Sequence, residues 1–164
     1  MTIFVKNKHT LQVDEFKFKC CVGKKGTTRQ KKEGDNKTPK GTFRIENLYF
    51  RKDRRKKPLT LLKCIEIKEG MGWCDDIRFP KKYNKLFKIK KNIRHEKLKR
   101  KDDKYDLMIP IKYNFKKPVT GLGSCIFVHL TNNYKPTAGC IALKEKDFLI
   151  MLKLIKRNTK IKIF

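Results

Sequence analysis

The most constraining feature of this sequence is a short apolar run at residues 125–130, which reads CIFVHL. Its β-branched and aromatic residues predict a buried strand. Because successive side chains of a strand point to opposite faces, the run divides into a wholly apolar face and a face that carries a histidine. The apolar face consists of Ile126, Val128 and Leu130. The other face consists of Cys125, Phe127 and His129.

A turn and a second cysteine follow this run. Residues 131–139 contain Asn, Pro and Gly, which are typical of turns, and Cys140 comes directly after Gly139. A thiol is a strong nucleophile only as the thiolate, which a nearby imidazole such as that of His129 can produce. The small residues before Cys140 would also let backbone amides approach a carbonyl oxygen closely. Spacing alone leaves open either a catalytic pair or a structural cysteine and histidine.

Two separated motifs resemble the L,D-transpeptidase catalytic domain of the YkuD type. They are EGDNKTPKGTFRI at residues 33–45 and PTAGCIAL at residues 136–143. Shorter segments resemble a divergent branch of this family: GMGWCDD (70–76), YN (83–84), RHE (94–96) and DKYDLMIPIKYN (103–114). The resemblance extends from about Phe18 to the C-terminus. The chain has TAGC where the family more often has SHGC, with Ala138 at the histidine position and Ala142 where an arginine is usual.

The resemblance implies a mainly β fold, a β-sandwich or barrel-like sheet with one C-terminal helix. It also implies a single L,D-transpeptidase-like catalytic domain over residues 1–164, which needs neither a cofactor nor a metal. We expect this domain to be a monomer.

The resemblance further implies a cysteine acyltransferase that acts on peptidoglycan stem peptides. Cys140 would be the nucleophile, His129 the general base, and the Gly139 amide a donor to the oxyanion. The thiolate would attack the carbonyl on the L-centre of diaminopimelate, release the terminal D-Ala and leave an acyl-thioester for an amine or water. The expected substrate-side or supporting residues are Thr137, Ala138, His95 and Trp73.

Three of these residues have more specific expected roles. Thr137 is expected to shape the loop before Cys140 and to hydrogen-bond His129. His95 would touch the substrate or have a structural role, and Trp73 would line a groove or pack in the core. Thr38, in the Thr-Pro-x-Gly turn, is expected to belong to the scaffold rather than to the chemistry.

The net charge of +28, from 44 Lys and Arg against 16 Asp and Glu, favours attraction to polyanions or reflects a general composition bias. A strongly basic β-rich module that binds nucleic acid or another polyanion is therefore an alternative function. No RNA-binding signature supports it, and we expect nucleic acid not to be the partner. A third alternative is a wall-peptide binder without catalysis, given Ala138 and Ala142. The basic run at residues 51–57 is interpreted as an anion-binding loop or a solvated hairpin tip.

The 6 cysteines form no CxxC pair, so the sequence gives little support to a zinc site. No segment has the length of a membrane span, and the residues after Met1 do not form a signal-like apolar stretch. The resemblance implies work in the cell envelope or periplasm, whereas the lack of a signal peptide leaves a cytoplasmic role open.

Local patterns predict the order of elements. We expect strands at 2–8 and 16–22 with a turn at 14–15, a strand at 41–50, a β region at 59–67, strands at 105–113 and 160–164, and a helix at 144–156. In the second of these strands, Phe16, Phe18 and Cys20 should share a core face. In the strand at 105–113, Leu107, Ile109 and Ile111 should share one face.

Overall fold

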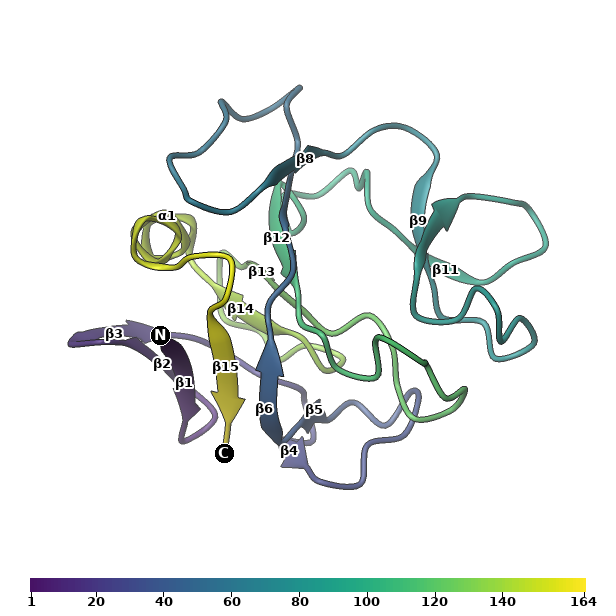
Figure 1. Cartoon of the computed structure of the whole chain (residues 1–164), viewed down its shortest axis with the longest axis horizontal. Helices are drawn as coiled ribbons and strands as arrows, with labels where there is room; N and C mark the ends of the chain where they lie inside the picture. The colour runs from purple at the N-terminus through teal and green to yellow at the C-terminus, as the bar shows by residue number, and fades with distance from the viewer.

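The computed structural model describes residues 1–164 and is mainly β, built around two five-stranded sheets (Figure 1). The first sheet has the order β3 (Phe16–Lys19), β2 (Thr10–Val13), β1 (Thr2–Lys6), β15 (Lys160–Ile163), β6 (Gly41–Arg44). The second has the order β14 (Ile141–Leu143), β13 (Phe127–Leu130), β12 (Leu107–Pro110), β7 (Leu48–Phe50), β8 (Cys64–Glu66). Both ends of the chain lie in the first sheet, where β1 and β15 pair in parallel.

Two smaller sheets and one helix complete the fold. The three-stranded sheet consists of β10 (Leu86–Lys88), β9 (Met71–Cys74) and β11 (His95–Lys97). The two-stranded sheet consists of β4 (Thr27–Thr28) and β5 (Thr38–Pro39). The helix is α1 (Glu145–Leu154), which lies between the N-terminal strands and the long β7–β8 loop (Figure 1). The expected mainly β fold with one C-terminal helix is confirmed.

The two large sheets are joined by isolated bridges, which gives the sandwich its barrel-like character. Cys21, just beyond β3, pairs with Ala142 in β14. Ile45, just beyond β6, pairs with Ile111 just beyond β12. Edges that would otherwise expose unpaired backbone groups are therefore partly closed.

Strand β13, which lies between β14 and β12, separates two hydrophobic clusters. Ile126, Val128 and Leu130 belong to a cluster of 25 buried residues between the large sheets. Phe127 belongs to a smaller cluster of 8 that also contains Cys140, and Cys125 packs against it. The predicted division of residues 125–130 into two faces is confirmed.

The predicted helix is confirmed with slightly narrower bounds. Phe148, Met151, Leu152 and Ile155 are all fully buried in the large cluster, as their helical spacing predicts. The helix ends at Leu154 because Ile155 is already extended, with φ −88° and ψ 156°. Acidic residues lie in its first turn and Lys153 in its last, which suits the helix dipole.

The predicted N-terminal strands were partly wrong. The chain turns at Asn7 and Lys8, whose φ values are 51° and 61°, and β2 follows where we expected no strand. The turn at 14–15 joins β2 to β3. Phe16 is 43% exposed and not part of a core face, because β3 is an edge strand, whereas Phe18 and Cys20 are buried.

Two further predictions gave strands that were too long. The expected strand at 41–50 is two strands, β6 and β7, which lie in different sheets. Of the expected β region at 59–67 only β8 is a strand. Leu107, Ile109 and Ile111 do share the face toward the large cluster.

The one helix of the chain is too short and not apolar enough to cross a membrane.

Candidate functional site

Cys140 lies directly before β14, on the sheet face opposite the large core. The parallel register places Ala142 beside His129 and therefore Cys140 beside Phe127. The Cys140 thiol donates a hydrogen bond to the Cys125 carbonyl at 3.1 Å, and Sγ accepts one from the Phe127 N–H at 3.4 Å. Cys140 is only 8% exposed. No hydrogen bond joins its thiol to the His129 ring.

The His129 ring is oriented by the backbone and by an aromatic neighbour. Its Nδ1 lies 2.8 Å from the Leu130 carbonyl oxygen. A carbonyl can only accept, so Nδ1 carries the proton of the neutral ring and Nε2 is the free acceptor. Tyr105 contacts the ring edge to face, with ring centroids 5.4 Å apart. This is the tautomer that a general base needs.

Burial sets the protonation of both groups. It lowers the pKa of His129 to about 4, although the bond to the Leu130 carbonyl opposes the shift. It raises the pKa of Cys140 to about 12, although the Phe127 N–H opposes that shift. At neutral pH the pair is therefore a neutral thiol and a neutral imidazole, not the ion pair of an activated cysteine.

Two cavities meet at Cys140. One, of about 510 Å³, is lined by His129 and by the turn that precedes Cys140; the other, of about 360 Å³, lies on the side of Glu33 and Ser124. Four residues line both: Glu96, Tyr105, Ala138 and Cys140. The structure thus brings Cys140, His129, Thr137 and Ala138 to one cavity, and Gly139 to the other.

The two cavities differ in charge. The larger is lined by the cations Lys24, Arg100, Lys104 and Lys135 and by one carboxylate, Glu96. The smaller is lined by Lys31 and Arg94 and by three carboxylates, Glu33, Asp75 and Glu96. An acidic peptide is therefore attracted more strongly by the larger cavity.

The loop before Cys140 is held by its own hydrogen bonds. The Thr137 hydroxyl donates to the Cys140 carbonyl at 2.6 Å and accepts from the Gly139 N–H at 3.1 Å. Thr137 thus bonds within the loop before Cys140 and not to His129, and its role toward the substrate stays a prediction. The Gly139 amide is engaged in this resting structure, and its oxyanion role stays a prediction that requires the amide to turn away from Thr137.

Thr38 connects the two motifs that are far apart in the sequence. Its fully buried hydroxyl donates to the Gly139 carbonyl at 2.8 Å and accepts from the Gly23 N–H at 2.9 Å. Gly139 has φ 147°, and a Cβ there would lie 3.0 Å from the Lys37 carbonyl oxygen. The turn before Cys140 therefore needs glycine at this position, and the TPKGTF motif holds it in place.

The buried side chain of Asn84 forms four hydrogen bonds in the region of Cys125. Its Oδ1 accepts from the Trp73 indole N–H at 2.9 Å and from the Cys125 N–H at 3.1 Å. Its Nδ2 donates to the carbonyls of Tyr113 and Asn114 at 3.0 and 2.7 Å. Cys125 has φ 54°, so Asn84 helps to keep a strained backbone whose carbonyl faces the Cys140 thiol.

His95 and Trp73 line neither cavity at Cys140. The His95 Nδ1 lies 2.6 Å from the Ile93 carbonyl oxygen, and its ring contacts Phe87. Trp73 is 3% exposed and packs against Phe127. His95 is thus held by local contacts, whereas Trp73 packs in the smaller cluster and also lines a separate groove of about 440 Å³. A contact of either residue with substrate stays a prediction. Arg94 and Glu96, the residues on either side of His95, line the cavities at Cys140.

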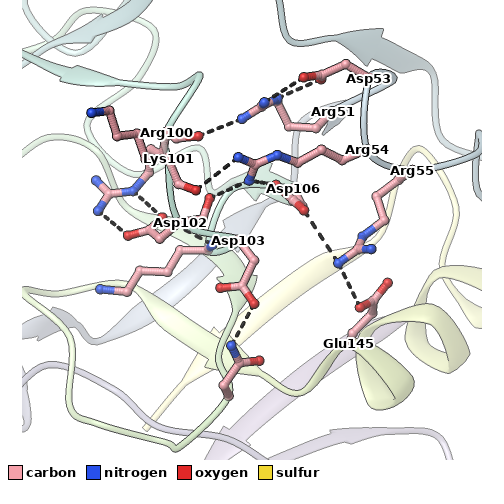
Figure 2. Close-up of polar contacts among 12 residues, drawn as sticks. Arg51, Asp53, Arg54, Arg55, Arg100, Lys101, Asp102, Asp103, Asp106 and Glu145 are labelled. Atoms are coloured by element: carbon pink, nitrogen blue, oxygen red, sulfur yellow. Dashed lines mark hydrogen bonds and ion pairs between the residues drawn. The ribbon is translucent and has the colours of Figure 1, made fainter.

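Tyr105 reaches His129 because an ion-pair network fixes the segment at residues 100–106. Figure 2 shows this segment held against the β7–β8 loop, where Arg54 donates to Asp106 at 3.1 Å. The Arg100 guanidinium lies over the Tyr105 ring, 5.1 Å from its centroid. The loop thereby holds the segment that supplies Arg100, Lys104 and Tyr105 to the wall of the larger cavity, although no residue of the loop lines that cavity itself.

Sequence reasoning missed Glu33, Asn84, Glu96 and Tyr105 as residues of this region. Glu33 accepts hydrogen bonds from the Ser124 hydroxyl at 2.6 Å and from the Tyr83 hydroxyl. All four lie in segments already quoted for the family resemblance, which was the available signal. No three His, Cys, Asp or Glu side chains are grouped so that they could hold a metal ion.

Comparison with known proteins identifies the family. Residues 1–163 match the family described as the L,D-transpeptidase catalytic domain, YkuD, so the chain belongs to that family. It is similar to the solved structure of Bd1075 from Bdellovibrio bacteriovorus, with 14% identity and a TM-score of 0.47 over 99% of this chain and 47% of that chain. The chain thus spans about half the length of Bd1075. No curated protein matches it.

Proposed function

We propose that this chain is a cysteine acyltransferase that cleaves and rejoins peptidoglycan stem peptides in the cell envelope. The observation that carries the proposal is that His129 in β13 and Cys140, directly before the neighbouring parallel strand β14, line one cavity in which the Nε2 of His129 is a free acceptor. Membership of the L,D-transpeptidase family supports the substrate class. The cationic wall of this cavity suits the carboxylates of a stem peptide.

The first half of the reaction is acyl transfer to Cys140. The thiol leaves the Cys125 carbonyl and gives its proton to the His129 Nε2, while Sγ attacks the carbonyl on the L-centre of diaminopimelate. The amides of Gly139 and Cys140 hold the oxyanion, a donor pair whose loss typically costs about 3 kcal/mol per donor in the barrier. His129 then gives the proton to the leaving D-Ala amine, and an acyl-thioester remains.

The second half removes the acyl group from Cys140. An amine of a second stem attacks the thioester with His129 again as base and forms a cross-link, or water attacks and releases a shortened stem. Because the resting pair is neutral, the proton transfer and the attack on the carbonyl proceed together rather than from a stored thiolate.

The decisive experiment is intact-mass spectrometry of the protein with a carbapenem, a drug class that the family resemblance predicts to acylate the active thiol, followed by turnover of a defined stem tetrapeptide. We expect one adduct that Cys140→Ser abolishes. Cys125→Ser is the matched control because Cys125 lines the smaller cavity beside Cys140, and it should keep the adduct. An adduct on Cys125, or none on folded protein, contradicts the proposal, and stem-peptide binding without turnover would indicate a non-catalytic binder.

A further inference from the structure

The β7–β8 loop, residues 51–63 with the sequence RKDRRKKPLTLLK, has a role that the acyltransfer site does not explain. It extends past β8 at one end of the molecule, beside α1 (Figure 1). Its side chains divide into arginines that make contacts within the molecule and lysines and leucines that are exposed to solvent. We call it the Arg-Lys-Leu loop.

The arginines of this loop form contacts within the molecule (Figure 2). Arg51 is 5% exposed and pairs with Asp53 at 2.6 Å, while its Nη1 donates to the Arg100 carbonyl at 2.7 Å. Arg54 donates to backbone carbonyls of residues 101 and 102, each at 2.9 Å. These contacts fix the backbone of the loop to the segment at residues 100–106.

Arg55 adds a second anchor, to the helix. Its guanidinium lies 3.5 Å from the Asp106 carboxylate and 3.1 Å from Glu145 in the first turn of α1. Asp106 is almost fully buried, with its side chain 3% exposed. The guanidinium groups are therefore largely used within the molecule, and the loop is preorganised rather than free to collapse.

Three lysines and two leucines of the loop are exposed and take no part in these anchors. Lys52, Lys56 and Lys57 are exposed, and with Arg54, Arg55 and Glu66 they line a groove of about 690 Å³. Leu59 is 77% exposed and Leu61 69%, the two most exposed large apolar side chains in the protein. Their neighbour Leu62 is 6% exposed and lies in the large core, so a firmly anchored segment presents both leucines to solvent.

We propose that the Arg-Lys-Leu loop docks on an anionic lipid surface. Leu59 and Leu61 enter the boundary between headgroups and acyl chains, and the three lysines contact lipid phosphates. A polyanion dissolved in water would attract the lysines but would offer nothing apolar to the leucines, whereas an anionic bilayer satisfies both groups. Because the arginines already order the loop, little conformational entropy is lost on docking.

The expected strength follows from the groups available. Each lysine near an anionic membrane raises the partition coefficient about fivefold, and each inserted leucine about tenfold. Docking is therefore reversible and weakens with salt, since exposed charges are screened over about 8 Å at physiological ionic strength. It would hold the catalytic cavities at the membrane without a membrane-spanning helix.

The test is co-sedimentation with vesicles of phosphatidylcholine, with and without phosphatidylglycerol. We expect binding that needs the anionic lipid, that falls about 100-fold in L59S/L61S and about 25-fold in K56Q/K57Q. Two matched controls keep the same chemistry elsewhere: V119S/L122S removes exposed apolar side chains from another loop, and K90Q/K91Q removes the same charge. Both should bind within about twofold of the unmodified chain.

Three results would overturn the proposal: no binding to anionic vesicles, unchanged binding of L59S/L61S, or an equal loss in the paired controls. Tight binding of single-stranded RNA that L59S/L61S does not weaken, together with no vesicle binding, would identify a dissolved polyanion instead. Cys140→Ser should bind vesicles like the unmodified chain. A failure of the proposed acyltransfer and a failure of lipid docking are thus separately visible.

Discussion

The two faces of β13 show how one strand can serve stability and chemistry at once. On one face, Val128 is closed into a cluster of 25 buried residues and lines neither cavity of the site. On the other, Phe127 and His129 lie beside Cys140, two cavities and a set of polar side chains. The first face is stabilised by hydrophobic packing, and on the second face hydrogen bonds position the side chains of His129 and Cys140.

Because the two faces differ in this way, substitutions on them should affect different properties of the protein. A change on the apolar face removes packing and acts on the free energy of unfolding. A change on the polar face leaves most of the packing and acts on the position or protonation of a reacting group. Substitutions on the two faces therefore separate an effect on folding from an effect on the reaction.

The largest effect should come from His129→Ala. Loss of the general base is expected to slow acylation of Cys140 by about 10²–10⁴-fold, with only a small change in the free energy of unfolding, because His129 contributes little to the large core. The measurement is the acylation rate by stem peptide or carbapenem, beside urea unfolding. An unchanged acylation rate would remove His129 from the base role.

Val128→Ala is the counterpart on the apolar face. Val128 is fully buried in the large cluster, so its truncation should lower the free energy of unfolding by about 2–3 kcal/mol. The fraction that stays folded should still acylate at the unmodified rate, because Val128 lines neither cavity. If folded Val128→Ala also lost acylation, the two faces would not be separable in the way described.

The free energy of unfolding should depend on pH through His129. Burial lowers the pKa of His129 from 6.5 to about 4, so between these values the unfolded chain binds a proton that the folded chain does not. Stability should therefore be fully present above pH 6.5 and fall as pH drops through 4, by at most about 1.4 kcal/mol per pH unit. His129→Gln should flatten this part of the curve.

The carboxylates provide the internal control for that titration. Hydrogen bonds from Lys31 and from the amides of Lys32 and Lys37 outweigh desolvation and lower the pKa of Asp35, and a hydrogen bond from Arg100 lowers that of Asp102. Their contribution is lost only as pH falls below the usual carboxylate value of 3.8, under the window of His129. A slope between pH 6.5 and 4 that survives His129→Gln would assign the effect to another group.

The smallest effect should come from Thr38→Val. It leaves the Gly139 carbonyl and the Gly23 N–H without a buried partner, at a cost of about 1–3 kcal/mol, and should slow acylation by about tenfold at most. Thr159→Val is the control, because Thr159 is equally buried and accepts from the Lys156 N–H at the far end of the fold. Equal acylation rates in the two variants would remove Thr38 from loop positioning.

Periodic patterns made much of this fold predictable from the sequence. The alternation at residues 125–130 gave both faces of β13, and the helical spacing of Phe148, Met151 and Leu152 gave the buried side of α1. Errors arose where no period could help. The turn at Asn7 depends on a left-handed backbone, and the division of residues 41–50 between two sheets depends on contacts far away in the chain.

The candidate site was predictable only in part. Cys140 and His129 could be paired because they lie close in the sequence on one strand and its following turn. The hydrogen bonds of Asn84 and the contact of Thr38 with Gly139 join segments that are far apart, which a single sequence does not reveal. His95 was chosen from its residue type, but the register of β11 turned Glu96 toward the cavities instead. The roles of all these residues, and the single domain, stay predictions.

The neutral state of Cys140 also bears on how long the protein survives in an oxidising environment. Peroxides and disulfides attack the thiolate, and a thiol buried with a pKa of about 12 is almost never in that form at neutral pH. All 6 cysteines are free, and most of them are buried. In the proposed mechanism Cys140 becomes reactive only when substrate displaces its contact with Cys125, so its burial would protect the thiol from oxidation between encounters with substrate.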